Sequence, residues 1–534
     1  MPAPRLSRPG LWPGRSVVLA RGGMVCTSQP LASAAALDVM RRGGNAIDAA
    51  ICASATLGVV EPLSTGIGGD MFAIYWSAKE KRLKGLNGSG RCPQNLSWRT
   101  FARRGINAVP NFGWAAATVP GCVDGWATLH AADGKLPWGV LFNAAIDYAR
   151  DGFPLSEIIA GEMSRVGPRL QNDAARAIFT PDGKPVSAGQ WFKNPDLAKS
   201  YEAIASGGAD AFYKGEIADK IVKAAQASEG YFVTDDFASH NSLWQDPVKA
   251  TFRGVDVYEL PPNGQGIAVL IALNILQSLE LDKLVDDWVG LTHAAIEAVK
   301  LAYAERNAHI ADPKTNPAPL DELLSLTFAT HAGMTIDPKR AIPRESSLVG
   351  TRDGGTVYLC TADAEGNVVS LISSLYQGGG GIVPEGTGIM LHNRGAGFTL
   401  EPDHPNQMQP KKRPFHTIIP GFAMRHGKPW LAFGVMGGHH QAQGHVQVLL
   451  NLLLHEMNLQ EAVSAPRFDF RTENFVALEA DFPPEVREAL QQKGHKIVEN
   501  DAGPFGGGQL LRVRSDGVYE GASDTRKDGC AIGY

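Results

Sequence analysis

Hydrophobic and polar residues follow two different periods in the first part of the chain. Residues 30–62 carry Ala, Leu, Val and Ile at the three-and-four spacing of buried helices, interrupted by Gly43-Gly44. Asn45 follows the break and is a good N-cap, so we expect two helices here. The alternating segments "MFAIYW" and "KRLKGLNGSG" then predict a strand hairpin.

The rest of the chain is predicted from the same periodicities. Residues 1 to about 20 look like an extended arm, and residues 118–310 are mainly helical, with a strand, a Pro-Gly loop and a buried helix at 254–279. Residues 313–350 predict a loop, and residues 352–381 predict a hairpin that turns at Glu365-Gly366-Asn367. The last third predicts strands at 387–392, 415–423 and 429–435, a helix at 440–456, and short strands within 466–480 and 508–522. These patterns indicate stacked layers of helices and sheets.

Composition narrows the function classes. The chain has 534 residues, 44% hydrophobic and 20% charged, with a net charge of −5. This is the composition of a globular protein with a large core, and no basic footprint indicates nucleic acid. The six scattered cysteines indicate neither a disulfide framework nor a zinc module. We find no apolar run of signal-peptide or membrane-span length, so we expect a cytoplasmic enzyme with a small-molecule substrate and no membrane partner.

The most informative single position is Thr356, in the sequence "RDGGTVYLC". A threonine hydroxyl is a weak nucleophile unless a base lies beside it, and an N-terminal threonine uses its own α-amine as that base. This chemistry requires a cut between Gly355 and Thr356, and glycine leaves that peptide uncrowded. From these residues alone, Thr356 is either such a nucleophile or an ordinary first residue of a strand.

A second candidate is "FGVMGGHHQAQGH", where a strand ends and a helix begins. The backbone N–H groups of Gly437 and Gly438 can point at an anion or a developing oxyanion, and the alternative is a tight turn. His439, His440 and His445 lie close together, so a metallohydrolase is a rival hypothesis. No neighbouring carboxylate or cysteine completes a metal-ligand set, which favours satisfied or solvent-facing histidines.

Two further segments carry residues typical of pocket walls. Arg91 in "NGSGRCP" can hold a carboxylate with paired hydrogen bonds, or it is a surface arginine. Residues 391–422 bring Arg394, Arg413, His416 and Thr417 together at predicted strand ends. The glycines of "EPLSTGIGGDMF" form a turn near a pocket rather than a nucleotide loop, because a strand follows them.

Several motifs in order resemble the γ-glutamyltranspeptidase family of N-terminal-nucleophile hydrolases, from about residue 22 to the C-terminus. The matching segments are "GGMVCTSQPLASAAALDVMRRGGNAIDAAICASATLGVVEPLSTGIGGDMF", "TVPGCVDGW", "ELPPNGQG", "GGTVYLCTADAEGNVVSLISS", "GTGIMLHNR" and "GVMGGHHQAQGHVQ". The resemblance implies an α+β, four-layer αββα sandwich. It also implies a precursor that cuts itself into a large subunit, residues 1–355, and a small subunit, residues 356–534, with Thr356 as nucleophile.

The resemblance assigns further roles and also shows departures. Ser374 stands where the family has a hydroxyl residue that supports the nucleophile, and Gly437 and Gly438 match its oxyanion glycines. The positions that hold a γ-glutamyl group differ. Ser89 replaces the family's arginine, with Arg91 two residues later, and Gly397 replaces the acidic residue that holds the α-ammonium.

The remaining substrate positions are rebuilt as well. His416 and Thr417 replace the family's paired serines, and Tyr376 replaces its carboxylate-binding asparagine. This pattern resembles a cytoplasmic-type branch that includes oxamate amidohydrolase. We therefore expect Arg91, Tyr376, Arg394, His416 and Thr417 to bind a small acid amide, with a γ-glutamyl amide as the other candidate.

The expected function is a self-cleaving amide hydrolase that passes an acyl-threonine intermediate to water or an amine. We expect no cofactor and no metal. The two fragments would stay together as a heterodimer, which could dimerise again. The alternative from a different class is an uncleaved, inactive relative that acts as a binding or scaffold protein, although such a protein has no need of Gly-Gly-Thr or Gly437-Gly438.

Overall fold

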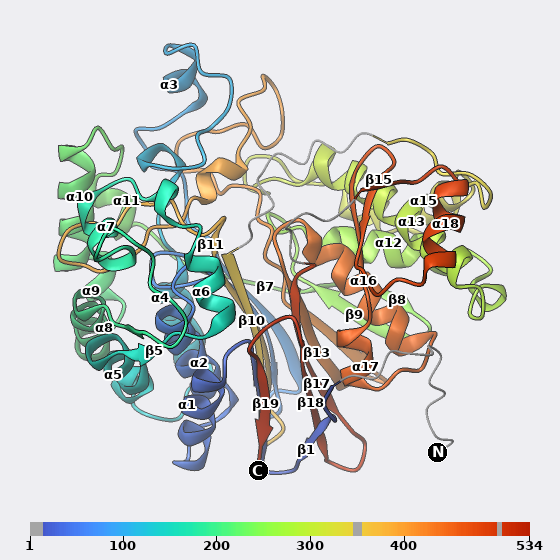
Figure 1. Cartoon of the computed structure of the whole chain (residues 1–534), viewed down its shortest axis with the longest axis horizontal. Coiled ribbons are helices and arrows are strands. Elements are labelled where there is room, and N and C mark those ends of the chain that lie inside the picture. The colour runs from blue at the N-terminus through green and yellow to red at the C-terminus, as the bar shows by residue number, and fades with distance from the viewer. Residues whose placement is uncertain (1–13, 345–354, 499–504) are drawn as a thin grey trace.

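The computed structural model describes residues 14–344, 355–498 and 505–534. Two antiparallel seven-stranded sheets pack face to face at the centre of the molecule (Figure 1). The strands of the first sheet, in spatial order, are β19 (Cys530–Gly533), β2 (Gly23–Thr27), β10 (Gly355–Asp363), β11 (Val368–Tyr376), β3 (Asp70–Ser77), β4 (Arg82–Gly88) and β7 (Leu243–Gln245). Those of the second sheet are β1 (Val18–Ala20), β18 (Tyr519–Ser523), β17 (Gly507–Val513), β13 (Lys428–Met436), β12 (Gly421–Arg425), β9 (Val255–Glu259) and β8 (Val248–Phe252).

A layer of helices covers the outer face of each sheet, which completes the predicted four-layer αββα sandwich (Figure 1). The first sheet is covered by α1 (Pro30–Arg41), α2 (Ala46–Val60), α4 (Cys122–Asp133), α5 (Asn143–Asp151), α8 (Pro195–Gly207) and α10 (Glu216–Ala227). The second sheet is covered by α12 (Ile267–Gln277), α13 (Trp288–His309), α16 (His440–Leu453) and α17 (Leu459–Ser464).

Shorter elements connect these layers. The short helices are α3 (Trp98–Ala102), α6 (Glu157–Met163), α7 (Asp173–Phe179), α9 (Asp210–Tyr213), α11 (Thr234–Ala238), α14 (Leu320–Leu323), α15 (Leu326–Gly333) and α18 (Pro484–Gln492). Two small sheets contain β14 (Phe468–Thr472), β15 (Phe475–Leu478) and β16 (Lys496–Val498) in one, and β5 (Phe153–Pro154) and β6 (Trp191–Phe192) in the other.

Helix α2 shows how the sequence builds the outer layer. Asn45 caps it with a complete capping box that includes Asp48, as the sequence predicted after Gly43-Gly44. Every residue of α2 is buried, and alanines let it approach the first sheet closely.

Strand β10 is buried on both faces, which explains the unbroken apolar run Val357–Cys360 at its centre. Val357 and Leu359 face the helical layer, whereas Tyr358 and Cys360 face the second sheet. Tyr358 packs directly on Gly434 of β13, where a Cβ atom would lie only 2.3 Å from the tyrosine ring. The two sheets are therefore in direct contact at Tyr358 and Gly434.

Two predicted segments are wrong, one helix was not predicted, and one strand begins later than predicted. Residues 387–392 form a loop and not a strand, because their partners are scattered loop residues such as Gly68 and not a neighbouring strand. The predicted loop 313–350 contains α14 and α15, whose apolar residues pack under the second sheet's helices. Helix α18 was not predicted at all. The strand predicted at 415–423 begins only at Gly421, and residues 1–13 and 345–354 lie outside the described residues.

Candidate active site

Thr356, Ser374 and Asp70 form one row across three neighbouring strands at the same end of the first sheet. Thr356 is paired with Ser374, and Ser374 is paired with Asp70. Their side chains share the face of Phe72 and Tyr358, so they point toward the second sheet. A bulge between Gly355 and Thr356 interrupts the pairing of β10 with β11, as often happens beside active sites.

Ser374 is the centre of the hydrogen bonds in this row. Its Oγ atom lies 2.9 Å from Thr356 Oγ1 and donates to the Gly355 carbonyl oxygen at 2.7 Å. It accepts from the Tyr376 backbone N–H at 2.8 Å and from Arg394 Nη2 at 3.4 Å. One hydroxyl group therefore contacts the candidate nucleophile, the carbonyl of the preceding peptide bond and a cation.

Gly355 is held where no larger residue fits. A Cβ atom at this position would lie 2.2 Å from the Leu63 carbonyl oxygen and 2.8 Å from the Gly378 nitrogen. The peptide bond between Gly355 and Thr356 is thus packed against backbone atoms that cannot move aside.

Arg394 supplies a buried positive charge beside the nucleophile. Nη1 donates to Thr417 Oγ1 at 2.9 Å, and the guanidinium lies 3.9 Å from the centre of the Tyr376 ring. Among the described residues, Arg394 Nε has no hydrogen-bond partner and no carboxylate bonds the guanidinium. Burial lowers the pKa of Arg394 to about 10, so it remains charged at neutral pH.

Tyr376 adopts a backbone conformation that side chains rarely take. Its φ angle is +72° although it is not glycine and is buried. Strain of this kind persists only where the surroundings enforce it, and it is concentrated at functional sites. Here it turns the Tyr376 ring under the guanidinium of Arg394.

His416 faces a carboxylate rather than an open pocket. Its Nε2 atom lies 2.9 Å from Asp70 Oδ2, and Gly90 and Gly121 donate backbone N–H groups to Asp70 Oδ1. Burial and the charge of Arg394 lower the pKa of His416 to about 3, so the imidazole is neutral at pH 7. Its Nε2–H group therefore donates a hydrogen bond to Asp70. Burial would raise the pKa of Asp70, but His392, His416 and Arg394 hold it well below its usual range.

The candidate oxyanion loop, Gly437-Gly438, joins the end of β13 to α16. Both residues have positive φ angles, +136° and +58°, which favour glycine. The Gly437 carbonyl accepts from His440 N–H at 3.0 Å. Within the described residues, neither glycine N–H has an acceptor, so both donors are available to a ligand.

Arg91 lies apart from the other predicted site residues. It follows β4, which is three strands from β10 in the first sheet. Because neighbouring strands lie about 4.8 Å apart, the two strand ends are separated by about 14 Å. Arg91 is partly exposed and donates to Asn241 Oδ1 at 3.1 Å. Among the described residues, Arg91 thus bonds Asn241, whereas Arg394 bonds Ser374 and Thr417, although sequence reasoning had grouped the two arginines together.

Two of the three histidines after the glycines contact different carboxylates. His440 Nδ1 lies 3.1 Å from Asp469, and His445 Nδ1 lies 2.8 Å from Glu259. The sequence showed no nearby carboxylate because both acids come from other elements. His440 and His445 thus each have their own acidic partner, which favours a structural role for these two over a shared metal ion.

One other group could offer three metal ligands in the part of the chain that the structure describes. It consists of His293, Glu297 and His495, all buried. His293 and His495 bond each other at 2.8 Å, and Glu297 pairs with Lys300 at 2.6 Å. These side chains already satisfy one another, and they belong to α13 and the loop before β16 rather than to the row of Thr356.

Sequence reasoning missed Asp70, Gln265, Tyr303 and Arg306. All four are buried and contact the residues just described. The segments "STGIGGDMF" and "ELPPNGQG" marked the first two as places of interest, but their partners lie far away in the sequence. No local pattern marked the two residues on α13.

A four-layer sandwich with a threonine at the start of a central strand defines the class of N-terminal-nucleophile amidohydrolases. The family model described as gamma-glutamyltranspeptidase matches residues 32–534. The chain therefore belongs to the γ-glutamyltranspeptidase family. None of its described helices combines the length and the apolar character needed to cross a bilayer.

Individual relatives span nearly the whole chain. The chain is 37% identical to the glutathione hydrolase-like YwrD proenzyme of Bacillus subtilis, over 96% of this chain and 98% of the relative. It is 30% identical to the oxamate amidohydrolase proenzyme of Klebsiella pneumoniae, over 96% and 98%. Among solved structures, cephalosporin acylase from Bacillus halodurans is similar with a TM-score of 0.93 and 38% identity, over 100% of this chain and 99% of that one.

Proposed function

We propose that the chain cleaves itself between Gly355 and Thr356 into fragments of 355 and 179 residues. The observation that carries this proposal is the position of Ser374, which contacts the Thr356 hydroxyl and donates to the Gly355 carbonyl. Attack of Thr356 Oγ1 on the Gly355 carbonyl carbon forms an ester as the C–N bond breaks, and the nitrogen takes a proton to become the α-amine. Water then hydrolyses the ester and leaves a carboxylate on Gly355.

The fragments would remain associated after the cut. In the first sheet, β10 from the small fragment lies between β2 of the large fragment and β11, and β11 pairs with β3 of the large fragment. In the second sheet, β12 of the small fragment pairs with β9 of the large one. Separating the fragments would expose the large hydrophobic cores to which both fragments contribute, so a heterodimer is the expected product.

The mature enzyme would use Thr356 on a substrate amide. The new α-amine, whose ordinary pKa is about 8, accepts the hydroxyl proton as Oγ1 attacks the substrate carbonyl. The N–H groups of Gly437 and Gly438 would stabilise the oxyanion, and the amine product would leave with the proton. Water, or an acceptor amine, then releases the acyl group from Thr356.

We further propose a small amide whose carboxylate lies next to the reacting carbonyl, as in oxamate. Arg394 and Thr356 both contact Ser374 Oγ, so the guanidinium lies within about 6 Å of the nucleophile. An unpaired buried cation at this distance fits the carboxylate of a short acid amide, and Thr417 adds a hydroxyl. Arg91 bonds Asn241 and does not share these contacts.

A γ-glutamyl amide is the second candidate, because one relative is named a glutathione hydrolase-like proenzyme. A γ-glutamyl group carries an α-ammonium that needs an anion. The position implied for that anion holds Gly397, and Asp70 is already bonded by His416 and two backbone N–H groups. These features favour the acid amide.

The deciding experiment begins with the intact mass of the purified wild-type protein and of Thr356→Ala. We expect two fragments from the first and a single 534-residue chain from the second. Two uncleaved chains would overturn the proposal and favour a binding or scaffold role. Turnover of oxamate, succinamate and γ-glutamyl-p-nitroanilide by the cleaved protein then identifies the acyl group. Fast γ-glutamyl transfer without oxamate cleavage would contradict the acid-amide proposal.

A further inference from the structure

Gln265 makes a dense set of hydrogen bonds in the loop between β9 and α12. Its side chain is buried, and Nε2 donates to the Gly438 carbonyl at 3.0 Å and to the Thr417 carbonyl at 2.6 Å. Its Oε1 atom accepts from Arg306 Nη1 at 2.8 Å. Because guanidinium can only donate and carbonyl oxygens can only accept, these partners fix which end of the amide points where. The single amide thus joins the Gly437-Gly438 loop to the residue that bonds Arg394.

Helix α13 supports this loop at two neighbouring points. Arg306 holds Gln265, and its guanidinium stacks on the Tyr303 ring at 3.8 Å. The Tyr303 hydroxyl donates to the His439 carbonyl. Tyr303 and Arg306 are three residues apart and therefore lie on the same face of α13. Burial lowers the pKa of Arg306 to about 10, which leaves it charged at neutral pH.

Three successive carbonyl groups of the loop are consequently held by donors. Gly437 is bonded by the His440 N–H, Gly438 by Gln265, and His439 by Tyr303. The N–H groups of Gly437 and Gly438 have no acceptor among the described residues. Because each carbonyl lies in one peptide plane with the N–H of the following residue, the bond to the Gly437 carbonyl fixes the Gly438 N–H directly. The bonds from Gln265 and Tyr303 hold the next two peptides, which limits rotation about the positive-φ glycine Gly438.

We propose that Gln265, backed by Arg306 and Tyr303, is a positioning residue that preorganises the oxyanion loop for substrate turnover. This inference rests on the proposed nucleophile Thr356. Preorganised donors stabilise the transition state more than the bound substrate, so losing their alignment lowers kcat more than it raises KM. Self-cleavage should not depend on Gln265, because the Gly355 carbonyl is bonded by Ser374.

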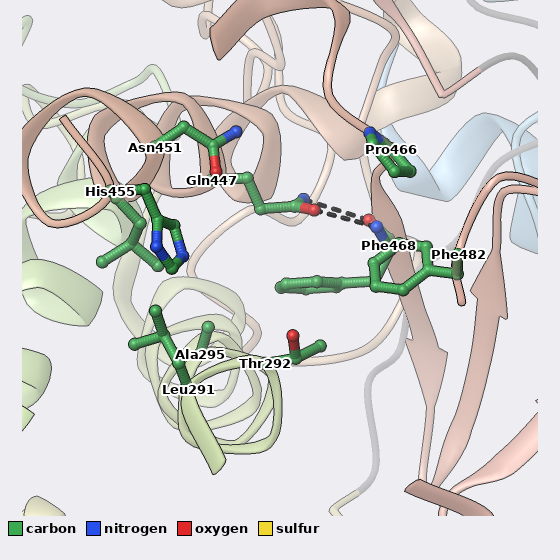
Figure 2. Close-up of a pocket in the computed structure, with 10 residues that line it drawn as sticks. Leu291, Thr292, Ala295, Gln447, Asn451, His455, Pro466, Phe468 and Phe482 are labelled. Atoms are coloured by element: carbon green, nitrogen blue, oxygen red, sulfur yellow. Dashed lines mark hydrogen bonds between the residues drawn. The ribbon is translucent and has the colours of Figure 1, made fainter. Parts of the chain in front are cut away.

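The test compares Gln265→Glu with Gln447→Glu, using whichever of oxamate and γ-glutamyl-p-nitroanilide the wild type turns over. Glutamate keeps the shape and the contact with Arg306 but removes the donor to the Gly438 and Thr417 carbonyls. Gln447 is a matched control, because its buried amide also clamps a backbone, that of Phe468, with bonds of 3.0 and 2.8 Å (Figure 2). It lies about 13 Å along α16 from Gly438.

We expect Gln265→Glu to cleave itself at the wild-type rate, to lose about 100-fold in kcat and to change KM less than about threefold. Gln447→Glu should lose stability but keep its kcat. Equal kcat values for the two variants, or a rise in KM alone, would overturn the inference. A Thr356→Ala protein that keeps its activity would instead overturn the proposed function, so the two failures are distinguishable.

A second pair of variants decides the matter if Gln265→Glu does not fold. Tyr303→Phe removes only the hydroxyl that holds the His439 carbonyl. Tyr201→Phe is its control, since that buried hydroxyl donates to the Ala55 carbonyl at 2.9 Å in the helical layer. We expect about a tenfold lower kcat for Tyr303→Phe and no change in kcat for Tyr201→Phe. The same kcat for both variants would overturn the inference.

Discussion

Ser374 Oγ, near the end of β11, lies 2.9 Å from Thr356 Oγ1, near the start of the neighbouring β10, and it also donates to the carbonyl of Gly355. This relationship places one hydroxyl between the nucleophile and the bond that we propose it cuts. In our proposal this hydroxyl polarises the Gly355 carbonyl and receives the Thr356 hydroxyl, with Arg394 as a further donor to it.

Ser374→Ala should slow self-cleavage by about 100-fold, because it removes the hydrogen bond to the Gly355 carbonyl and the partner of the Thr356 hydroxyl. Cleavage can be followed by the appearance of the two fragments after cell-free synthesis. The control is Ser373→Ala, since the neighbouring Ser373 points to the opposite face and bonds Thr65 Oγ1 at 2.6 Å. Equal cleavage rates for the two variants would contradict the role given to Ser374.

Gly355→Ala should yield an uncleaved chain of lower stability. The added Cβ atom would collide with the Leu63 carbonyl and the Gly378 nitrogen, and backbone atoms in a buried site cannot yield cheaply. We expect Gly355→Ala to lower Tm. The control Gly161→Ala should not lower it, because no atom lies within 4 Å of the added Cβ and alanine has a higher helix propensity than glycine. A Gly355→Ala protein that cleaves and melts like the wild type would show that the packing here is looser than we describe.

Arg394→Met should lower kcat/KM for oxamate by about 100-fold or more, because a carboxylate would lose its charged partner. Arg394→Lys should restore only part of the loss, since lysine lacks the planar fork that reaches Thr417 and Ser374 together. Arg91→Met should change kcat/KM less than threefold. Steady-state kinetics on the three variants measure these changes in kcat/KM. A larger effect for Arg91→Met than for Arg394→Met would mean that Arg91, and not Arg394, binds the substrate carboxylate.

Glu61 should make stability fall as pH rises. Burial raises its pKa to about 7, despite Lys527, and its Oε2 atom has no partner among the described residues. The folded state therefore holds a proton that the unfolded chain has released, and stability is lost between about pH 4.5 and 7, by an amount on the order of 3 kcal/mol. The substitution Glu61→Gln should therefore change the free energy of unfolding more favourably at pH 8 than at pH 4.

Urea unfolding of the uncleaved Thr356→Ala chain measures this difference as a single transition. Glu157→Gln, at an exposed position on α6, is the control for removing one carboxylate. A difference between Glu61→Gln and its parent that is the same at pH 4 and pH 8 would mean that Glu61 is not held protonated in the fold.

The sequence by itself determined the parts whose cause is local. Gly-Gly-Thr before an apolar strand, the Gly437-Gly438 turn, and the capped alanine helix at Asn45 each carry their signal within a few residues. Motifs in a fixed order determined the family and hence the four layers. A fully buried strand such as β10 could be predicted because its apolar run needs no partner to be recognised.

Only the tertiary structure decided which polar groups meet. Asp70 and His416 are 346 positions apart, and Gln265 and Gly438 are 173 apart, so no periodicity connects them. The sequence grouped Arg91 with Arg394 as candidate carboxylate-binding residues, yet Arg91 bonds Asn241 whereas Arg394 bonds Ser374 and Thr417. The segment 387–392 has the apolar residues of a short buried strand but is a loop without ladder partners, because pairing is a property of the whole fold.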